Sequence, residues 1–322
     1  MALTWSDLTA VTNADIVPNM VDNVFKSSAL LTRLRTKRRL KFPGGTFIRQ
    51  PIMYQQLKGG PTTRGATFDV SYVETDTAMA FLLKEYYVNI TMYGVDSPLN
   101  KGPNAAMSMI ESKMANAASS MATYLDTDLF NDGQGTVSQP ISLDGLLAAV
   151  DNGTNYPSYG GITRSDIAPT DANNVGINAY YNSLTGPLSL SNVQTAFGAT
   201  WFGNEHVDLM VCPQAVWDIL WSKIQPQQRF NDETDIAEAG FHAIRWNGCT
   251  ICVDQYAPAG ILWGLNTDYV DLYVSDDEKW AWGFTGFKEF PNSVDAAGQY
   301  LFLGNLVVSA PRLCFQLAGI TS

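Results

Sequence analysis

The spacing of apolar and polar positions divides the first third of the chain into a helical segment and a β-hairpin. Apolar residues recur every three or four positions up to Leu34, which predicts helix over residues 13–41. Strict alternation then appears on both sides of a glycine-rich tip at 58–65, over 68–72 and over 86–92. This period of two predicts a long hairpin over 42–93. Its apolar content is too low for a separate core, so we expect it to project and rest on another surface.

The clearest helix in the sequence follows the hairpin. Gly102-Pro103 favours a helix start, and Asn131-Asp-Gly133 favours an end. Between them, apolar positions step by three and four, at Met107, Ile110, Met114, Ala117, Met121, Leu125 and Leu129. A helix of this length measures about 40 Å and can act as a spine across a domain.

The rest of the chain mixes loops, helices and strands. Residues 133–190 are rich in Gly, Asn, Ser, Thr and Pro, which predicts loops apart from an apolar piece at 143–150. From residue 189 a compact α/β pattern resumes, and it contains a hairpin turn at Trp246-Asn-Gly248. The remaining C-terminal residues are mostly strand, and we expect one strand over 301–317. The sequence therefore predicts the α+β class.

Charge is distributed unevenly along the chain. The 20 Lys and Arg residues against 31 Asp and Glu residues give a net charge of −11, which argues against general binding of nucleic acid or anionic membranes. Residues 1–64 nevertheless hold ten basic and three acidic residues, a net of +7, so the remainder carries −18. A chain divided in sign in this way can attract copies of itself.

No stretch of the sequence carries a recognisable catalytic, cofactor-binding or metal-binding motif. The two histidines, His206 and His242, have no partner at metal-ligand spacing. Cys249 and Cys252 form C-x-x-C on a predicted strand, where residues three apart face opposite sides, so we interpret them as core thiols. No apolar run approaches the roughly 20 residues that span a bilayer. We predict no enzyme activity, no cofactor and no membrane contact.

Six of the nine residues at 33–41 are basic, and this run has three interpretations. It is a solvated helix end, a nucleic-acid site, or a contact with acidic surface on a neighbouring subunit. The second interpretation is weakened because the run holds no aromatic residue for base stacking and the rest of the chain repels phosphate. We favour the third interpretation. The predicted inter-subunit contact residues are Arg33, Arg35, Lys37, Arg38, Arg39 and Lys41, with Lys58 and Arg64 on the hairpin.

The order of these parts resembles the major capsid protein of tailed bacteriophages, which has the Hong Kong 97-like fold. The resemblance covers nearly the whole chain and rests on sequence and spacing together. Its most particular stretches are Asp132-Gly133, Leu143-Asp-Gly-Leu146, Tyr159-Gly-Gly-Ile-Thr-Arg164 and Asp208-Leu-Met-Val-Cys-Pro213, the last followed by a helix with Trp217.

The resemblance implies a division of the chain into the parts of that fold. Residues 1–41 would be the N-terminal arm and 42–93 the extended hairpin, called the E-loop. Residues 94–135 and 256–322 would form the peripheral domain with its spine helix. Residues 136–185 would be a loop or insertion region, and 186–255 the axial domain.

The resemblance also implies a function and partners. Family members assemble as hexamers and pentamers into an icosahedral head shell that encloses double-stranded DNA without reading its sequence. We therefore expect a virion protein, assembled in the host cytoplasm, together with a portal and a possible decoration protein. Because the chain begins directly at the arm, the resemblance implies a separate scaffolding protein or prior trimming.

Three other functions stay open at the sequence level. An encapsulin, the shell of a cellular compartment, would share the fold but enclose cargo enzymes. An enzyme with a site of scattered carboxylates would be a small particle with a pocket of convergent titratable groups. A nucleic-acid binder using residues 33–41 would show a steep salt dependence of its DNA affinity.

Overall fold

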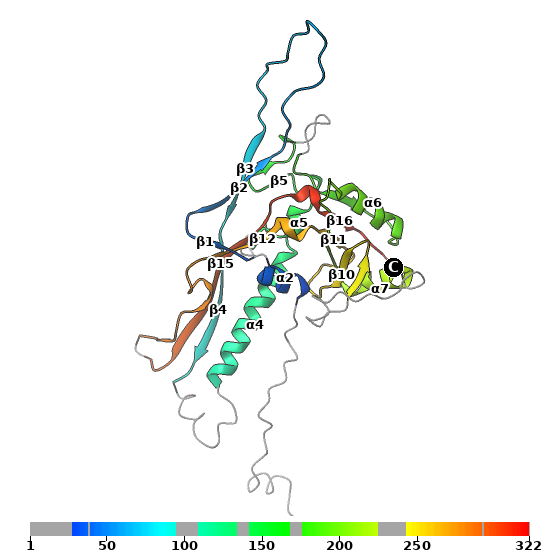
Figure 1. Ribbon diagram of the computed structural model, residues 1–322. Helices are drawn as coiled ribbons and strands as arrows, with labels where there is room; N and C mark the ends of the chain where they lie inside the picture. The colour runs from blue at the N-terminus through cyan, green and yellow to red at the C-terminus, as the bar shows by residue number, and fades with distance from the viewer. Residues whose placement is uncertain are drawn as a thin grey trace, which may run out of the picture.

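The computed structural model of the chain describes residues 28–37, 39–94, 109–133, 142–167, 176–224, 243–291 and 293–321. Two six-stranded sheets with their helices form the body, and a β-hairpin projects from it (Figure 1). This mixture of helices and strands confirms the predicted α+β class. None of the described helices is long and apolar enough to cross a bilayer.

The first sheet is organised around one long strand, β15, which runs for 13 residues. Its strand order is β1-β12-β15-β13, and β4 and β14 pair with further parts of β15. The pairing with β4 is antiparallel from Lys84↔Gly304 to Met92↔Ala296. The strands are β1 (Arg39–Phe42), β4 (Lys84–Met92), β12 (Val270–Ser275), β13 (Ala281–Phe284), β14 (Lys288–Glu289) and β15 (Ala296–Val308).

Helix α4 (Met109–Leu129) packs on this sheet, against β4 and β15. Met121, Leu125 and Leu129 are each at most 1% exposed, as their four-residue spacing predicts. The predicted spine helix is confirmed from residue 109 onward, and 103–108 lie outside the described residues. Gly133, with φ +73°, follows the helix in a backbone conformation that favours glycine.

Helix α2 (Ala29–Lys37) lies on α4 and β12. Leu30 and Leu34 are fully buried and belong to the same core cluster as Met121, Leu125 and Leu129 of α4. The arm helix is therefore integrated into the body from Ala29 onward.

The second sheet has the order β7-β16-β11-β8-β10-β9 and is covered by helices α6 (Leu190–Thr200) and α7 (Gln214–Ile224). The predicted turn at Asn247-Gly248 is confirmed, because both residues have positive φ and join β9 to β10. The strands are β7 (Tyr180–Ser183), β8 (Leu209–Cys212), β9 (Ala243–Trp246), β10 (Cys249–Val253), β11 (Leu262–Leu265) and β16 (Phe315–Ala318).

The projecting hairpin consists of β2 (Phe47–Met53) and β3 (Asp76–Leu82), paired antiparallel from Phe47↔Leu82 to Met53↔Asp76. Its base is anchored because Met79 and Phe81 are buried, and Phe81 contacts the ring of Tyr159 edge-on. Tyr159 belongs to a short hairpin, β5 (Ser158–Tyr159) and β6 (Ile162–Thr163). Residues 54–75 extend beyond the paired part (Figure 1).

The basic run is not wholly helical, which corrects the prediction of helix over 13–41. Helix α2 ends at Lys37, and Arg39–Phe42 forms β1, an edge strand parallel to β12. Residues 39–42 are extended because they pair with β12 at the open edge of the first sheet. The spacing of apolar residues does not predict such pairing. Residues 13–27 and Arg38 lie outside the described residues.

The alternation over 86–92 does form a strand, β4, but that strand is not a limb of the hairpin. It pairs with β15, more than 200 positions along the chain, whereas β3 pairs with β2. The alternation over 68–72 lies in the extended tip and forms no strand. A period of two predicts an extended segment and its two faces, but it does not identify the partner strand.

Two expectations for later parts of the chain are also corrected. The strand expected over 301–317 is two strands, β15 and β16, which belong to different sheets and are separated by the short helix η4 (Pro311–Leu313). Within 136–185, α5 (Leu146–Ala149) lies in the apolar piece expected at 143–150 and joins the core, whereas β7 adds to the second sheet a strand that the composition did not predict. Burial of a few apolar residues in each segment outweighs the loop-rich composition around them.

Candidate assembly surfaces

The tip of the projecting hairpin exposes large apolar side chains. The most exposed of them are Met53 (77%), Leu57 (72%), Phe68 (76%), Val70 (92%) and Tyr72 (90%). Single exposed apolar residues are common on soluble proteins, but a group concentrated on one projection marks an interaction site. The tip is therefore a candidate surface for contact with another molecule.

Polar contacts join the two limbs of the hairpin within the tip. Lys58 Nζ lies 3.0 Å from Asp69 Oδ2 and donates a hydrogen bond of 2.8 Å to Ser71 Oγ. Hydrogen bonds from Ser71, and then from Lys58, hold the pKa of the Asp69 carboxyl well below its usual range. Lys58, one of the predicted contact residues, thus has an acidic partner on the opposite limb of its own hairpin.

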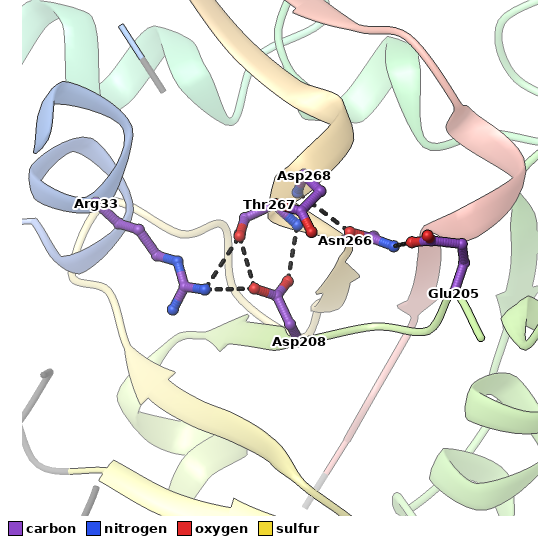
Figure 2. Close-up of polar contacts among 6 residues, drawn as sticks. All are labelled: Arg33, Glu205, Asp208, Asn266, Thr267 and Asp268. Atoms are coloured by element: carbon purple, nitrogen blue, oxygen red, sulfur yellow. Dashed lines mark hydrogen bonds and ion pairs between the residues drawn. The ribbon is translucent and has the colours of Figure 1, made fainter. Parts of the chain in front are cut away.

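Arg33 of α2 binds the second sheet of the same chain, as Figure 2 shows. Its Nη2 forms an ion pair with the carboxylate of Asp208, the residue before β8, and lies 3.1 Å from Thr267 Oγ1. The same carboxylate accepts hydrogen bonds from Thr267 N at 2.7 Å and from Thr267 Oγ1 at 2.6 Å. Asp208 therefore joins the arm helix to the short helix η3 (Thr267–Tyr269).

The network continues beyond Thr267 (Figure 2). Asn266 caps η3, because its Oδ1 accepts a hydrogen bond of 3.1 Å from Asp268 N. Its Nδ2 donates to Glu205 Oε2 at 3.2 Å. These bonds tie α2, the segment before β8 and the turn before β12 into one unit, so Arg33 has a role inside the chain.

The other predicted contact residues lie in different settings. The guanidinium of Arg35 lies over the Trp282 ring, 4.9 Å from its centroid. Lys41 Nζ lies 2.8 Å from Asp276 Oδ1, and Arg64 is exposed on the tip. Arg38 and the side chains of Lys37 and Arg39 lie outside the described part of the chain. The structure thus does not gather the eight residues into one patch, and an inter-subunit role for them stays a prediction.

The sequence did not predict a buried polar cluster at the base of the hairpin. Asn305 of β15 is fully buried, and its Nδ2 donates to Leu82 O at 2.8 Å and to Asp144 Oδ2 at 2.7 Å. Its Oδ1 accepts from Asp144 N at 3.0 Å and from Leu306 N at 2.8 Å. Lys84 Nζ lies 3.5 Å from Asp144 Oδ1. The only sequence signal was Asp144 within Leu143-Asp-Gly-Leu146, which gives no indication of a partner 161 positions away.

The described residues offer no metal centre and no reactive thiol. No group of three or more His, Cys, Asp or Glu side chains in this part of the chain is placed to hold a metal ion. All four cysteines are buried, which confirms that Cys249 and Cys252 are core thiols. Burial raises the pKa of the Cys212 and Cys314 thiols to about 12, so neither forms a thiolate near neutral pH.

No family model and no curated protein matches this chain by sequence. Solved structures do match it over its whole length. The capsid asymmetric unit of cyanophage A-1(L) is 14% identical with a TM-score of 0.71, covering 99% of this chain and 100% of that one. The chain has the Hong Kong 97-like capsid fold. This likeness confirms the predicted resemblance at the level of the fold.

Two further matches extend the range of shells that share this capsid fold. The capsid of a native GTA particle is 10% identical with a TM-score of 0.67, covering 99% of this chain and 100% of that one. The holo-SrpI encapsulin complex from Synechococcus elongatus PCC 7942 is 12% identical with a TM-score of 0.66, covering 99% and 96%. The fold thus occurs in shells of viral and of encapsulin type.

Proposed function

We propose that this chain is the major capsid protein of a tailed bacteriophage. In this role it assembles as hexamers and pentamers into an icosahedral head shell around double-stranded DNA. The observation that carries the proposal is the full-length match to the cyanophage A-1(L) capsid subunit, which extends from the arm helix to the last strand. The protein would be a virion component that assembles in the host cytoplasm with a scaffolding protein, a portal and a possible decoration protein.

The projecting hairpin supports this proposal on physical grounds. Its tip exposes Phe68, Val70 and Tyr72, and the two-stranded part beneath them has no core of its own. A neighbouring subunit can cover these side chains, and head-to-tail contacts of this kind close into rings when the rotation permits. Each such interface should bury at least about 1,000 Å².

The predicted contact residues are part of this proposal, but Arg33 has a different role from the others. Arg64 lies exposed on the tip, and Arg35 and Lys41 are on the arm helix and on β1. We propose that these residues, with Lys37, Arg38, Arg39 and Lys58, contribute to contacts between subunits. Arg33 contributes by fixing the arm helix on its own subunit, through Asp208.

The experiment that tests the proposal is electron microscopy of the full chain, expressed alone and with the neighbouring genes of its source. We expect uniform closed shells that contain double-stranded DNA when the packaging partners are present. A chain that stays a monomer of 35.2 kDa under all of these conditions would contradict the proposal.

An encapsulin-type shell is the second candidate, because the SrpI encapsulin shares this fold with a TM-score of 0.66. The two candidates differ in what the shell encloses. Mass spectrometry and nuclease digestion of purified shells separate them, because an encapsulin would hold a cargo protein and no nuclease-protected DNA.

An enzyme with scattered carboxylates is a weaker candidate. A groove of about 530 Å³ between β4 and α4 contains the carboxylates of Glu85 and Asp128. Asp128 accepts a hydrogen bond of 2.6 Å from the Tyr86 hydroxyl, and burial followed by this bond raises the pKa of Tyr86. The bond between Tyr86 and Asp128 serves to fix β4 on α4.

A further inference from the structure

Three segments that are distant in the sequence meet at a pair of buried carboxyl groups. Asp126 lies near the end of α4, Asp254 directly follows β10, and Ser28 directly precedes α2. Their exposed fractions are 2%, 1% and 3%. Carboxyl groups this deeply buried are expected to be paired, hydrogen-bonded or protonated.

Asp254 has the contacts of an ionised carboxylate. Its Oδ2 accepts hydrogen bonds from Ser28 Oγ at 2.6 Å and from Leu30 N at 3.4 Å, and its Oδ1 accepts from Tyr256 N at 3.0 Å. Leu30 belongs to the first turn of α2 and Ser28 directly precedes it, and negative charge is favourable at this end of a helix. Asp254 therefore holds the N-terminal end of α2 on the second sheet.

Asp126 has a different environment. Its Oδ1 has no hydrogen-bond partner within the described part of the chain, and its remaining contact is with Ser28. Ser28 has one hydroxyl proton, which it donates to Asp254, while its Oγ accepts from Leu31 N at 3.2 Å. Towards Asp126 the hydroxyl can therefore only accept, so this contact is favourable when Asp126 carries a proton and donates it.

We propose that Asp126, Ser28 and Asp254 form a proton-dependent clasp that holds the arm helix α2 on α4 and the second sheet. With Asp126 protonated, hydrogen bonds run from Asp126 to Ser28 and from Ser28 to Asp254, and the three segments are joined. When Asp126 loses its proton, two buried negative charges face each other across one hydroxyl and the clasp opens.

The charged groups around Asp126 agree with this arrangement. Burial, as the first cause, raises the pKa of Asp126 to about 8, and the charge of Asp254 acts in the same direction. The positive charge of Arg35 on α2 acts in the opposite direction and lowers the pKa of Asp126. Because the pKa is higher with the clasp closed than in an open, hydrated state, closure is favoured at low pH. This advantage is lost progressively as the pH rises towards about 8.

Trypsin can measure the opening, because α2 and β1 contain several cleavage sites, among them Arg33, Arg35 and Lys41. The exposed site at Arg64 on the hairpin tip is an internal reference for the activity of the protease at each pH. Cleavage within α2, divided by cleavage at Arg64, is measured on the unassembled full chain between about pH 7 and about pH 9. We expect a rise of about tenfold, most of it below about pH 8, if the open-state acid titrates near its usual value.

Variants of the two acids give the decisive comparison. Asp126→Asn can still donate to Ser28 but does not titrate, so its cleavage ratio should be independent of pH. Asp254→Asn removes the repelling charge and lowers the pKa of Asp126, so the rise should become smaller. Glu111→Gln, a change of an exposed acid on the same helix, should keep the wild-type rise.

A wild-type ratio that does not change with pH would overturn the proposal, and so would a rise in Asp126→Asn equal to that of the wild type. If Asp126→Asn does not fold, the wild-type profile and the Asp254→Asn profile decide the question together. The clasp does not depend on the proposed capsid function, because the measurement uses single subunits and applies whether or not shells form.

Discussion

At the residue scale, Asn305 is a polar side chain of the core whose loss should be costly. It is fully buried and joins β15 to Leu82 and Asp144 through four hydrogen bonds. Replacement by the similarly shaped Leu leaves the donors and acceptors around it unpaired. We expect Asn305→Leu to lower the free energy of unfolding by about 2–4 kcal/mol in urea denaturation.

Asn89 supplies the matched control, since it lies exposed on β4, which pairs with β15. Asn89→Leu should change the free energy of unfolding by no more than about 0.5 kcal/mol. Equal effects of the two substitutions would show that the cluster around Asn305 does not contribute to stability.

A pair of glycines allows a second test at this scale. A Cβ on Gly145 would lie 2.4 Å from Asn131 O and 2.5 Å from Asp128 O, so these carbonyls at the end of α4 would have to move. Because φ at Gly145 is −78°, the obstacle is space and not backbone strain. We expect Gly145→Ala to lower the melting temperature, with a loss of about 1–3 kcal/mol.

Gly198 offers the opposite situation, because it lies within α6 and a Cβ there would meet no atom within 4 Å. Gly198→Ala should therefore raise the melting temperature, with a gain of about 0.5–1 kcal/mol from the higher helix propensity of alanine. A loss of stability at Gly198, or none at Gly145, would contradict the packing described for these positions.

Residue-scale predictions from the sequence succeeded where the cause was local. The turn at Asn247-Gly248 was predictable because positive φ at two successive residues is met by these residue types. The role of Arg33 was not predictable, because its partners Asp208 and Thr267 lie 175 and 234 positions away. A dense basic run indicates where cations are, but it does not identify the acids that they meet.

At the element scale, the sequence predicted most of the strands but fewer of their pairings. The alternation at 86–92 correctly indicated a strand, and the hydrophobic spacing of α4 correctly indicated its buried face. The partner of β4 could not be inferred, because β2, β3 and β15 all offer extended, half-buried surfaces. Pairing of β4 with β15 is decided by the whole sheet, including the cluster around Asn305 where β4 begins.

The attachment of the arm helix α2 to the body leads to a prediction for Arg33. Its ion pair with Asp208 is partly buried, with side-chain exposures of 20% and 33%, and is supported by Thr267. Arg33→Met keeps the aliphatic stem but leaves Asp208 without a cation. We expect a loss of about 1–2 kcal/mol in the free energy of unfolding, read from chemical denaturation of the monomer.

Lys41 is the corresponding control on β1. Its ion pair with Asp276 is exposed, at 71% and 54%, and exposed pairs contribute little. Lys41→Met should leave the free energy of unfolding within about 0.5 kcal/mol of the wild type. If both substitutions cost the same, the network of Figure 2 does not hold the arm helix more firmly than a surface ion pair does.

At the scale of the whole molecule, the positive charge of the N-terminal part is partly paired with acidic residues of the same chain. Among the predicted contact cations whose side chains the structure describes, Arg33, Lys41 and Lys58 have acidic partners within the chain. Part of the charge of +7 in residues 1–64 is thus neutralised inside one subunit. Charge steers partners towards each other, whereas apolar burial supplies most of the free energy of association. The exposed apolar side chains of the tip therefore support assembly more strongly than the charge division does.

The final prediction concerns this tip. Phe68, Val70 and Tyr72 contact solvent in the single chain, so their replacement by Ser should leave its fold and melting temperature unchanged. In a shell each would be buried, and each buried side chain contributes about 1.5–3 kcal/mol. Since 1.4 kcal/mol corresponds to about a tenfold change in an equilibrium constant, the triple variant should weaken every subunit contact by at least about a thousandfold.

We therefore expect the triple Ser variant to remain a folded, unassembled chain in analytical ultracentrifugation and electron microscopy. A second triple variant, Thr62→Ser, Thr63→Ser and Ala66→Ser, changes the same number of exposed tip positions without removing large apolar groups. It should assemble as the wild type does. Normal shells from the first variant would mean that another surface holds the subunits together, whereas failure of both variants would point to the backbone of the tip and not to its apolar side chains.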